Sequence, residues 1–127
     1  MSALVVDTSS WIEWLGGRLV APLREGLGEG RVHLPPIVVA EILSGRLSES
    51  HRRAIEALLN ALPLCQSDLA HWFRVGALRH LLSSRGLQVS IPDTHVAQCA
   101  LDLDAELLTE DAIFARIARH CPLRLAS

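Results

Sequence analysis

The chain has 127 residues, half of them hydrophobic and a fifth charged, and its formal net charge is −2. This composition is typical of one globular domain. From this length and composition we expect a single domain over residues 1–127. No apolar run approaches the ~20 residues of a membrane span, and the first residues lack the pattern of a signal peptide. We therefore expect no membrane association and a cytoplasmic location. All 12 cationic side chains are arginines, which excludes every mechanism that needs a catalytic or phosphate-binding lysine.

Short apolar runs alternate with longer helical patterns, which predicts a parallel sheet with helices on both faces. The expected strands span residues 4–6, 32–34, 64–65, 106–108 and 123–125. Apolar residues at helical spacing predict helices over residues 55–62, 68–85, 96–101 and 113–118. Glycine- or proline-containing segments at 16–17, 26–30, 35–36 and 85–86 predict turns.

Asp7 directly follows the first expected strand and is followed by Thr8 and Ser9. In open parallel α/β sheets, ligands bind outside the carboxyl ends of the strands, which makes Asp7 a candidate site residue. An aspartate at this position is also a good helix N-cap, so the residue alone leaves both interpretations open.

Glu41 lies inside the apolar segment 36–43, with Ile37 and Val38 about one helical turn before it. Burying an unpaired carboxylate costs several kcal/mol, so we expect Glu41 to be paired with a cation. An arginine from elsewhere in the chain or a metal ion would serve.

Two further acids follow capping residues: Asp93 comes three residues after Ser90, and Asp111 two residues after Thr109. Helix capping explains each acid separately, but not why four acids lie after expected strands or in the helices that follow. Four neighbouring carboxylates raise one another's pKa values unless divalent cations lie among them, and oxygen ligands alone suit Mg²⁺ or Mn²⁺ better than Zn²⁺. In the rest of the chain cationic side chains outnumber acidic ones, which suits a polyanionic substrate.

Four segments together resemble the PIN-domain ribonucleases: VVDTS at 5–9, PIVVAEILSG at 36–45, IPDTHVA at 91–97 and LLTEDAIF at 107–114. The resemblance covers essentially the whole chain and points to the VapC-type toxins of bacterial type II toxin–antitoxin systems. It implies a PIN-like three-layer α/β/α sandwich with a five-stranded parallel sheet and an acidic pocket at the strand ends.

The same resemblance assigns catalysis and metal binding to Asp7, Glu41, Asp93 and Asp111, and contacts with the substrate to Thr8, Ser9 and Thr109. It implies a Mg²⁺- or Mn²⁺-dependent endoribonuclease that inhibits translation or growth, with RNA as substrate. The implied protein partners are an antitoxin that caps the pocket and carries the DNA-binding part, and a second copy of the chain. Trp11, Trp14 and apolar residues between 69 and 82 would suit such a homodimer.

Some residues depart from this pattern or add to it. His95 stands where the family usually has an apolar residue, and we interpret it as a packing residue. Glu110 adjoins Asp111, and the T-x-D spacing favours Asp111 as the metal ligand. Arg46, just beyond Glu41, is the one arginine that we name as a substrate contact near the pocket mouth, and a solvated residue at a helix end is the alternative interpretation. The other histidines show no ligand spacing, and the three cysteines, Cys65, Cys99 and Cys121, are interpreted as small buried residues.

Two other functions compete with the nuclease. A strand followed by an aspartate also suggests a phosphoaspartyl phosphatase-like enzyme, but such enzymes need a second aspartate where this chain has Ser9, or a lysine. A non-enzymatic α/β interaction module, whose acids only cap helices, is the other alternative. It predicts no effect of divalent metal on the melting temperature, whereas a metal-binding nuclease is stabilised.

Overall fold

The computed structural model describes residues 2–127, which form four strands and seven helices. In chain order these are β1 (Leu4–Val6), α1 (Thr8–Leu15), α2 (Ala21–Gly28), β2 (Val32–His33), α3 (Pro36–Leu43), α4 (Glu49–Asn60), α5 (Leu69–Ser84), α6 (Ile91–Leu103), β3 (Glu106–Leu108), α7 (Ile113–Ile117) and β4 (Arg124–Leu125). None of the helices in these residues has the length and apolar character needed to cross a membrane.

The strands form one parallel sheet in the order β2-β1-β3-β4. All three residues of β1 are buried, which requires cover on both faces of the sheet and agrees with the expected three-layer sandwich. The expected fifth strand is reduced to a single parallel bridge between Leu34 and Leu64, so the five-strand count is corrected to four. Pro63 has no N–H to extend this pairing, and the side chain of Leu64 is exposed.

Helix α2 replaces a stretch that was partly expected to be a turn. Pro22 in the first turn favours the helix start, and Gly26 lies where the helix meets the sheet. A Cβ atom at Gly26 would lie 2.9 Å from Leu4 Cδ2 and 3.1 Å from Val32 Cγ2. The glycine therefore permits the close approach of the helix to β1 and β2.

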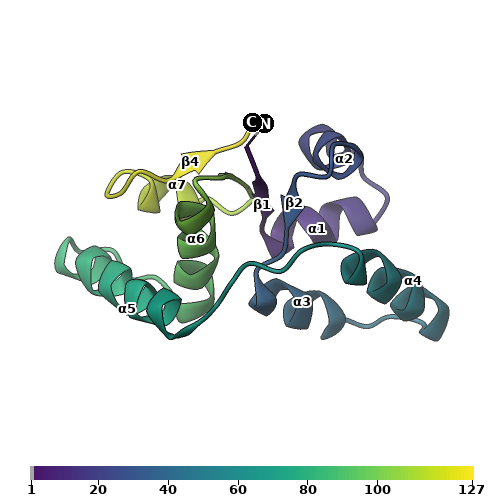
Figure 1. The fold of residues 1–127 in the computed structure, drawn as a ribbon, viewed down its shortest axis with the longest axis horizontal. Helices are drawn as coiled ribbons and strands as arrows, with labels where there is room; N and C mark the ends of the chain where they lie inside the picture. The colour runs from purple at the N-terminus through teal and green to yellow at the C-terminus, as the bar shows by residue number, and fades with distance from the viewer. Residues whose placement is uncertain (1) are drawn as a thin grey trace.

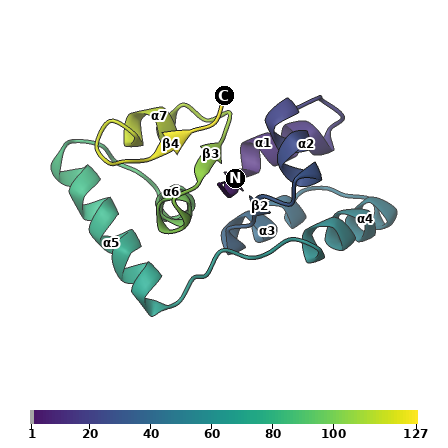
Figure 2. The same ribbon diagram turned by 45° about the horizontal axis from the view of Figure 1, so that its top comes forward.

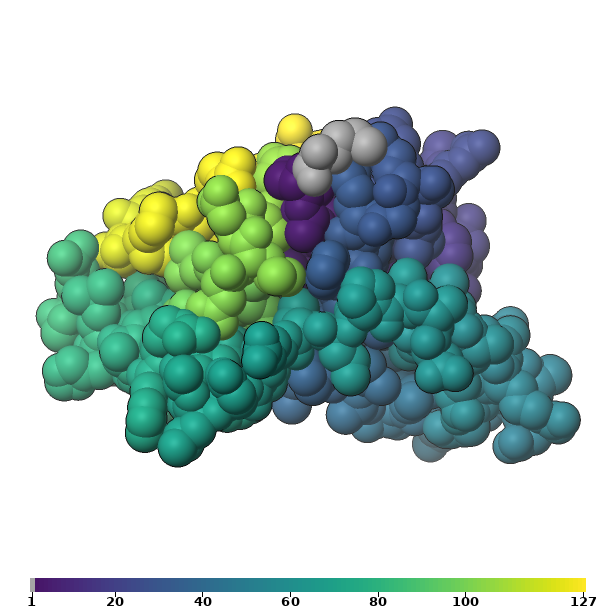
Figure 3. Space-filling model, in the orientation of Figure 1, coloured from purple at the N-terminus to yellow at the C-terminus, as the bar shows by residue number. Residues whose placement is uncertain are grey.

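Figure 1 shows β1 near the middle of the molecule, with α1 to α4 to one side and α5, α6, α7 and β4 to the other. Turned by 45°, the same fold shows α6 between α5 and the sheet, in agreement with its contacts to β1, β3 and α5 (Figure 2). The space-filling view shows the chain between α4 and α5, coloured teal, along the lower part of the molecule where the two sides meet (Figure 3).

Trp11 lies in the core, with none of its surface exposed. It is therefore not available to a dimer interface, and that part of the expectation is wrong. Trp14 is partly buried, whereas Leu69, Trp72 and Phe73 on α5 are exposed. The apolar spacing in α1 is the same for a core-facing and a surface-facing tryptophan, which is why the sequence did not separate them.

Candidate metal centre at the strand ends

Asp7 is buried at the carboxyl end of β1 and occupies the N-cap position of α1, yet its side chain makes no capping hydrogen bond. Instead, Ser9 Oγ and Thr109 Oγ1 both donate to Asp7 Oδ2, each at 2.9 Å. The carboxylate is thus held by side chains from two separate strand ends. The side chain of Asp7 therefore does not cap the helix, which was the alternative explanation for an aspartate at this position.

The loop after β3 reinforces this arrangement. Thr109 Oγ1 accepts from the backbone N–H of Asp111 at 3.0 Å, and Ser9 Oγ accepts from the backbone N–H of Glu110 at 3.0 Å. Each hydroxyl therefore accepts a hydrogen bond from a backbone N–H and donates one to the carboxylate of Asp7. The network fixes the loop that carries Asp111 against the first turn of α1.

Glu41, on α3, is exposed, and its Oε1 accepts a hydrogen bond from Thr8 Oγ1 at 2.8 Å. The expectation of a glutamate in apolar surroundings that needs a cation to be buried is therefore wrong. Ile37 and Val38 come one turn earlier, but Val38 faces the core while Glu41 lies at the surface where α3 meets α1. The apolar character of the segment does not by itself say which side of a short helix is covered.

Asp93 is half-buried in the first turn of α6, where Ser90 caps the helix by accepting from the backbone N–H of Asp93. Burial raises the pKa of the Asp93 carboxyl, and the negative charges of Asp7, Asp111 and Glu41 raise it further. The structure thus brings together the four acids that the sequence picked out. Glu110 is not among the groups acting on Asp93. Its carboxylate lies 4.0 Å from Arg18, which favours Asp111 as the acid that faces the site.

The site offers carboxylate oxygens, with hydroxyl groups behind them, and no sulfur or imidazole ligand. This donor set fits a hard divalent cation such as Mg²⁺ or Mn²⁺. Within residues 2–127, no three of the acids have ligand atoms within 4.8 Å of one another, so the acids lie around an open centre.

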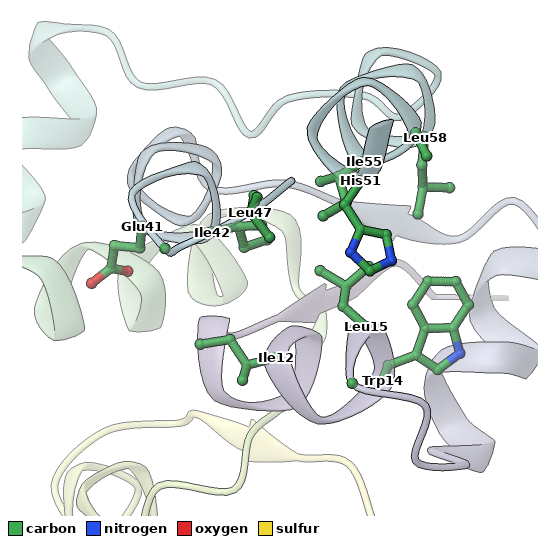
Figure 4. A pocket seen from close by; sticks show the side chains of 12 residues that line it. Ile12, Trp14, Leu15, Glu41, Ile42, Leu47, His51, Ile55 and Leu58 are labelled. Carbon is green, nitrogen blue, oxygen red and sulfur yellow. The ribbon is translucent and has the colours of Figure 1, made fainter. Parts of the chain in front are cut away.

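A groove of about 620 Å³ has Glu41, alone among the four acids, in its lining and was not expected from the sequence. Its walls come from α1, α3 and α4, and most of the residues along it are apolar: Ile12, Trp14, Leu15, Ile42, Leu47, Ile55 and Leu58. Figure 4 shows Glu41 at one end of the groove and His51 over its middle. Arg46, the arginine expected near the site, is exposed in the loop after α3.

The parallel sheet with acids at its carboxyl edge is the arrangement expected of a PIN-domain protein. The comparison with protein families gives the same result. The family model described as "PIN domain" matches residues 4–120. The chain therefore belongs to the PIN-domain family.

Its curated relatives place it within the VapC type of that family. The chain is 32% identical over 131 aligned residues to a protein named VapC ribonuclease Mb1587 of Mycobacterium bovis, and equally to Ribonuclease VapC11 of Mycobacterium tuberculosis. Each alignment covers 98% of this chain and 98% of the relative.

Solved structures with the same fold include VapBC from Salmonella typhimurium bound to DNA, with a TM-score of 0.83, 21% identity and coverage of 99% and 98% of the two chains. VapBC-5 of Mycobacterium tuberculosis, of the VapBC family of toxin–antitoxin systems, gives a TM-score of 0.69 at 23% identity, with 98% of each chain covered. These similarities confirm the PIN-domain fold of this chain.

Proposed function

We propose that the chain is a metal-dependent endoribonuclease and the toxin of a toxin–antitoxin pair, acting in the cytoplasm. The observation that carries the proposal is the hydroxyl network that holds Asp7, Glu41 and the Asp111 loop together at the end of β1, with Asp93 within reach of their charges. The names of its two relatives, both ribonucleases of the VapC type, support RNA as the substrate.

Asp7, Glu41, Asp93 and Asp111 would hold Mg²⁺ or Mn²⁺ and are the catalytic residues of this proposal. Such a cation lowers the pKa of a coordinated water and neutralises charge on the leaving 3′ oxygen of a phosphodiester, so that cleavage leaves 5′-phosphate and 3′-hydroxyl ends. The pKa of Asp93 is raised by burial and also by the negative charges of the other three acids, and a bound cation would offset the effect of those charges.

We expected the hydroxyls of Thr8, Ser9 and Thr109 to contact the substrate. Their hydrogen bonds support another role, which is to orient the carboxylates. Thr8 donates to Glu41, and Ser9 and Thr109 donate to Asp7. Ser9 and Thr109 also accept backbone N–H groups, which occupies their oxygens further. We assign to these hydroxyls the orientation of the carboxylates, with contact to a phosphate oxygen as a secondary role.

The apolar groove supports a place for the antitoxin. The VapBC structures that share this fold are complexes of a toxin–antitoxin family. A segment of the antitoxin with apolar side chains would fill the groove between α1 and α4, and an arginine at its end would reach Glu41 and the neighbouring acids (Figure 4). In that position the arginine takes the place of the cation and blocks activity. DNA would be contacted by the antitoxin and not by this chain.

A homodimer belongs to the proposal as well, with the exposed Leu69, Trp72 and Phe73 of α5 as its apolar contact. Trp11 has no part in it. Light scattering at micromolar concentration tests the assembly, and a monomer there contradicts it.

Cleavage of total bacterial RNA by the purified chain, with and without Mn²⁺, tests the nuclease. Discrete metal-dependent cuts with 5′-phosphate ends are expected, and Asp93→Asn should abolish them because it keeps the shape of the side chain and removes its charge. Equal cleavage by the wild type and by Asp93→Asn contradicts the assignment.

A further inference from the structure

A second polar cluster lies between α5 and α6 and belongs to no part of the function proposed above. His71 and His95 are buried there, 0% and 1% exposed, and Cys99 follows His95 by one helical turn. One ligand atom of each lies within 4.8 Å of the others, and this is the only such group of three in residues 2–127. Two buried imidazoles beside a thiol need a chemical explanation.

The hydrogen bonds of the cluster give the two rings a direction. His71 Nδ1 lies 2.7 Å from Asp102 Oδ2, and His71 Nε2 lies 2.8 Å from His95 Nδ1. Arg74 and Gln98 also donate hydrogen bonds to the carboxylate of Asp102. Asp102 therefore acts as an acceptor and takes the Nδ1 proton of His71 in a hydrogen bond. This leaves the lone pair of His71 Nε2 facing His95, which is how a carboxylate orients a metal-binding histidine.

Two thiols complete the group of donors. Cys99 Sγ lies 3.8 Å from the Nε2 atom and 3.9 Å from the Nδ1 atom of His95. The thiol of Cys65 is buried too, and it lies outside the group of three close ligand atoms. A cavity of about 200 Å³ lined in part by Cys65, Cys99 and Asp102 adjoins the cluster and gives a cation a way in.

We propose that His71, His95 and Cys99, joined by Cys65 through a change of its side-chain rotamer, form a second metal site that takes one Zn²⁺ or a cation of similar softness. Two imidazoles and two thiolates are a common ligand set for tetrahedral zinc, whereas the oxygen ligands of the carboxylate centre suit Mg²⁺ or Mn²⁺. Binding releases the two thiol protons and moves the ring proton of His95 from Nδ1 to Nε2, so that His71 and His95 both present a lone pair.

The charges and the cover of the site agree with this assignment. Two thiolates neutralise a divalent cation, and Asp102 is already paired with Arg74 at 2.8 Å, so the buried group carries no net charge. Trp72 stacks on His95, with ring centroids 4.7 Å apart and 12° between the planes. Four protein ligands leave no open position, which is typical of a structural site. The cation would join the segment at Cys65 and helix α5 to helix α6.

Titration of the reduced full chain with Co²⁺ tests the proposal, because thiolate-to-cobalt charge-transfer absorption arises only where sulfur is a ligand. The expected result is absorption that saturates at one equivalent and is displaced by Zn²⁺. Cys121→Ser, a matched control for the remaining cysteine, should keep this signal. Cys99→Ser and His95→Gln should each weaken binding by at least tenfold, and Asp102→Asn by about 10- to 100-fold.

Several results would overturn the proposal: no charge-transfer absorption in the reduced protein, an unchanged signal in Cys99→Ser, or a Cys65–Cys99 disulfide whose reduction yields no metal binding. Circular dichroism of the metal-free variants checks that they are folded, and His95→Gln decides the matter if Cys99→Ser is not. Asp93→Asn should keep the cobalt signal. Failure of the nuclease assignment and failure of this site are therefore separate outcomes.

Discussion

The carboxylate centre and the histidine–cysteine cluster are both built from polar side chains, but they differ in exposure and in how the chain assembles them. The carboxylates are spread around an open centre, with Glu41 and Asp111 exposed, while His71, His95 and Cys99 are buried with ligand atoms within 4.8 Å. An open oxygen site suits a hard cation that keeps its waters, and a closed nitrogen–sulfur site suits a softer one. Because Asp7 is buried as well, the two regions differ in the chemistry and spacing of their ligand atoms more than in burial alone.

Replacing one side chain in the histidine–cysteine cluster and one in the carboxylate centre should change the free energy of unfolding by different amounts, and this is the largest effect that we expect. His71→Ala removes the hydrogen bonds of His71 to Asp102 and His95 and opens a cavity, so we expect a loss of about 2–4 kcal/mol in denaturant unfolding. Asp93→Asn removes a repelled charge, and the metal-free protein should be as stable as the wild type or more so.

His80→Ala is the control for the first variant, because His80 lies exposed on the same helix. It should cost less than about 0.5 kcal/mol. Equal destabilisation by His71→Ala and His80→Ala would show that the buried cluster does not stabilise the packing of α5 on α6.

The groove lined by Glu41 is expected to bind the antitoxin, whereas the carboxylates are expected to carry out catalysis, and a variant in the groove can separate the two roles. Ile12 is 58% exposed on the wall of the groove, so Ile12→Glu should fold normally. It places a charge where the antitoxin would bury apolar side chains, and its affinity for the antitoxin should fall by at least about tenfold in a calorimetric titration. Leu19→Glu, at a similarly exposed leucine that does not line the groove, should bind like the wild type. Equal loss in both would place the antitoxin elsewhere.

The smallest effect is expected from the hydroxyls that orient the acids. Thr8→Val keeps the shape of the side chain but removes its hydrogen bond to Glu41. The cleavage rate should fall by about tenfold, the effect of one hydrogen bond to a charged group, with little change in stability. Ser44→Ala removes a hydroxyl near Glu41 that bonds only to the backbone of Ala40, and should leave the rate unchanged. A Thr8→Val rate equal to that of Ser44→Ala would remove the positioning role.

The grouping of the four acids could be predicted only in part from local signals. Asp7 directly follows β1, and Asp111 lies shortly after β3, so the parallel sheet itself brings both to one edge. The alternation of strands and helices was also sufficient for the fold. What the sequence misjudged was burial: Trp11 is in the core and Glu41 is at the surface.

The histidine–cysteine cluster carried no such signal. His71 and His95 are separated by 24 residues and lie on two helices, and their contact depends on how α5 packs across α6. Cys65 and Cys99 are farther apart in the chain, yet both line one cavity. The only hint was His95 in place of an apolar residue, and no local spacing rule shows that its neighbour is another histidine. The groove was missed for the same reason, because its walls come from three helices.

A titration of the full chain with Mn²⁺, followed by the loss of the electron paramagnetic resonance signal of the free ion, tests the central claim most directly. If the four acids form the site, the wild type, Glu110→Gln and Cys99→Ser should bind Mn²⁺ with the same affinity. Asp7→Asn and Asp93→Asn should bind Mn²⁺ at least about tenfold more weakly. Equal binding by the wild type and Asp93→Asn, or its loss in Cys99→Ser alone, would contradict the claim that the four acids form the hard-cation site.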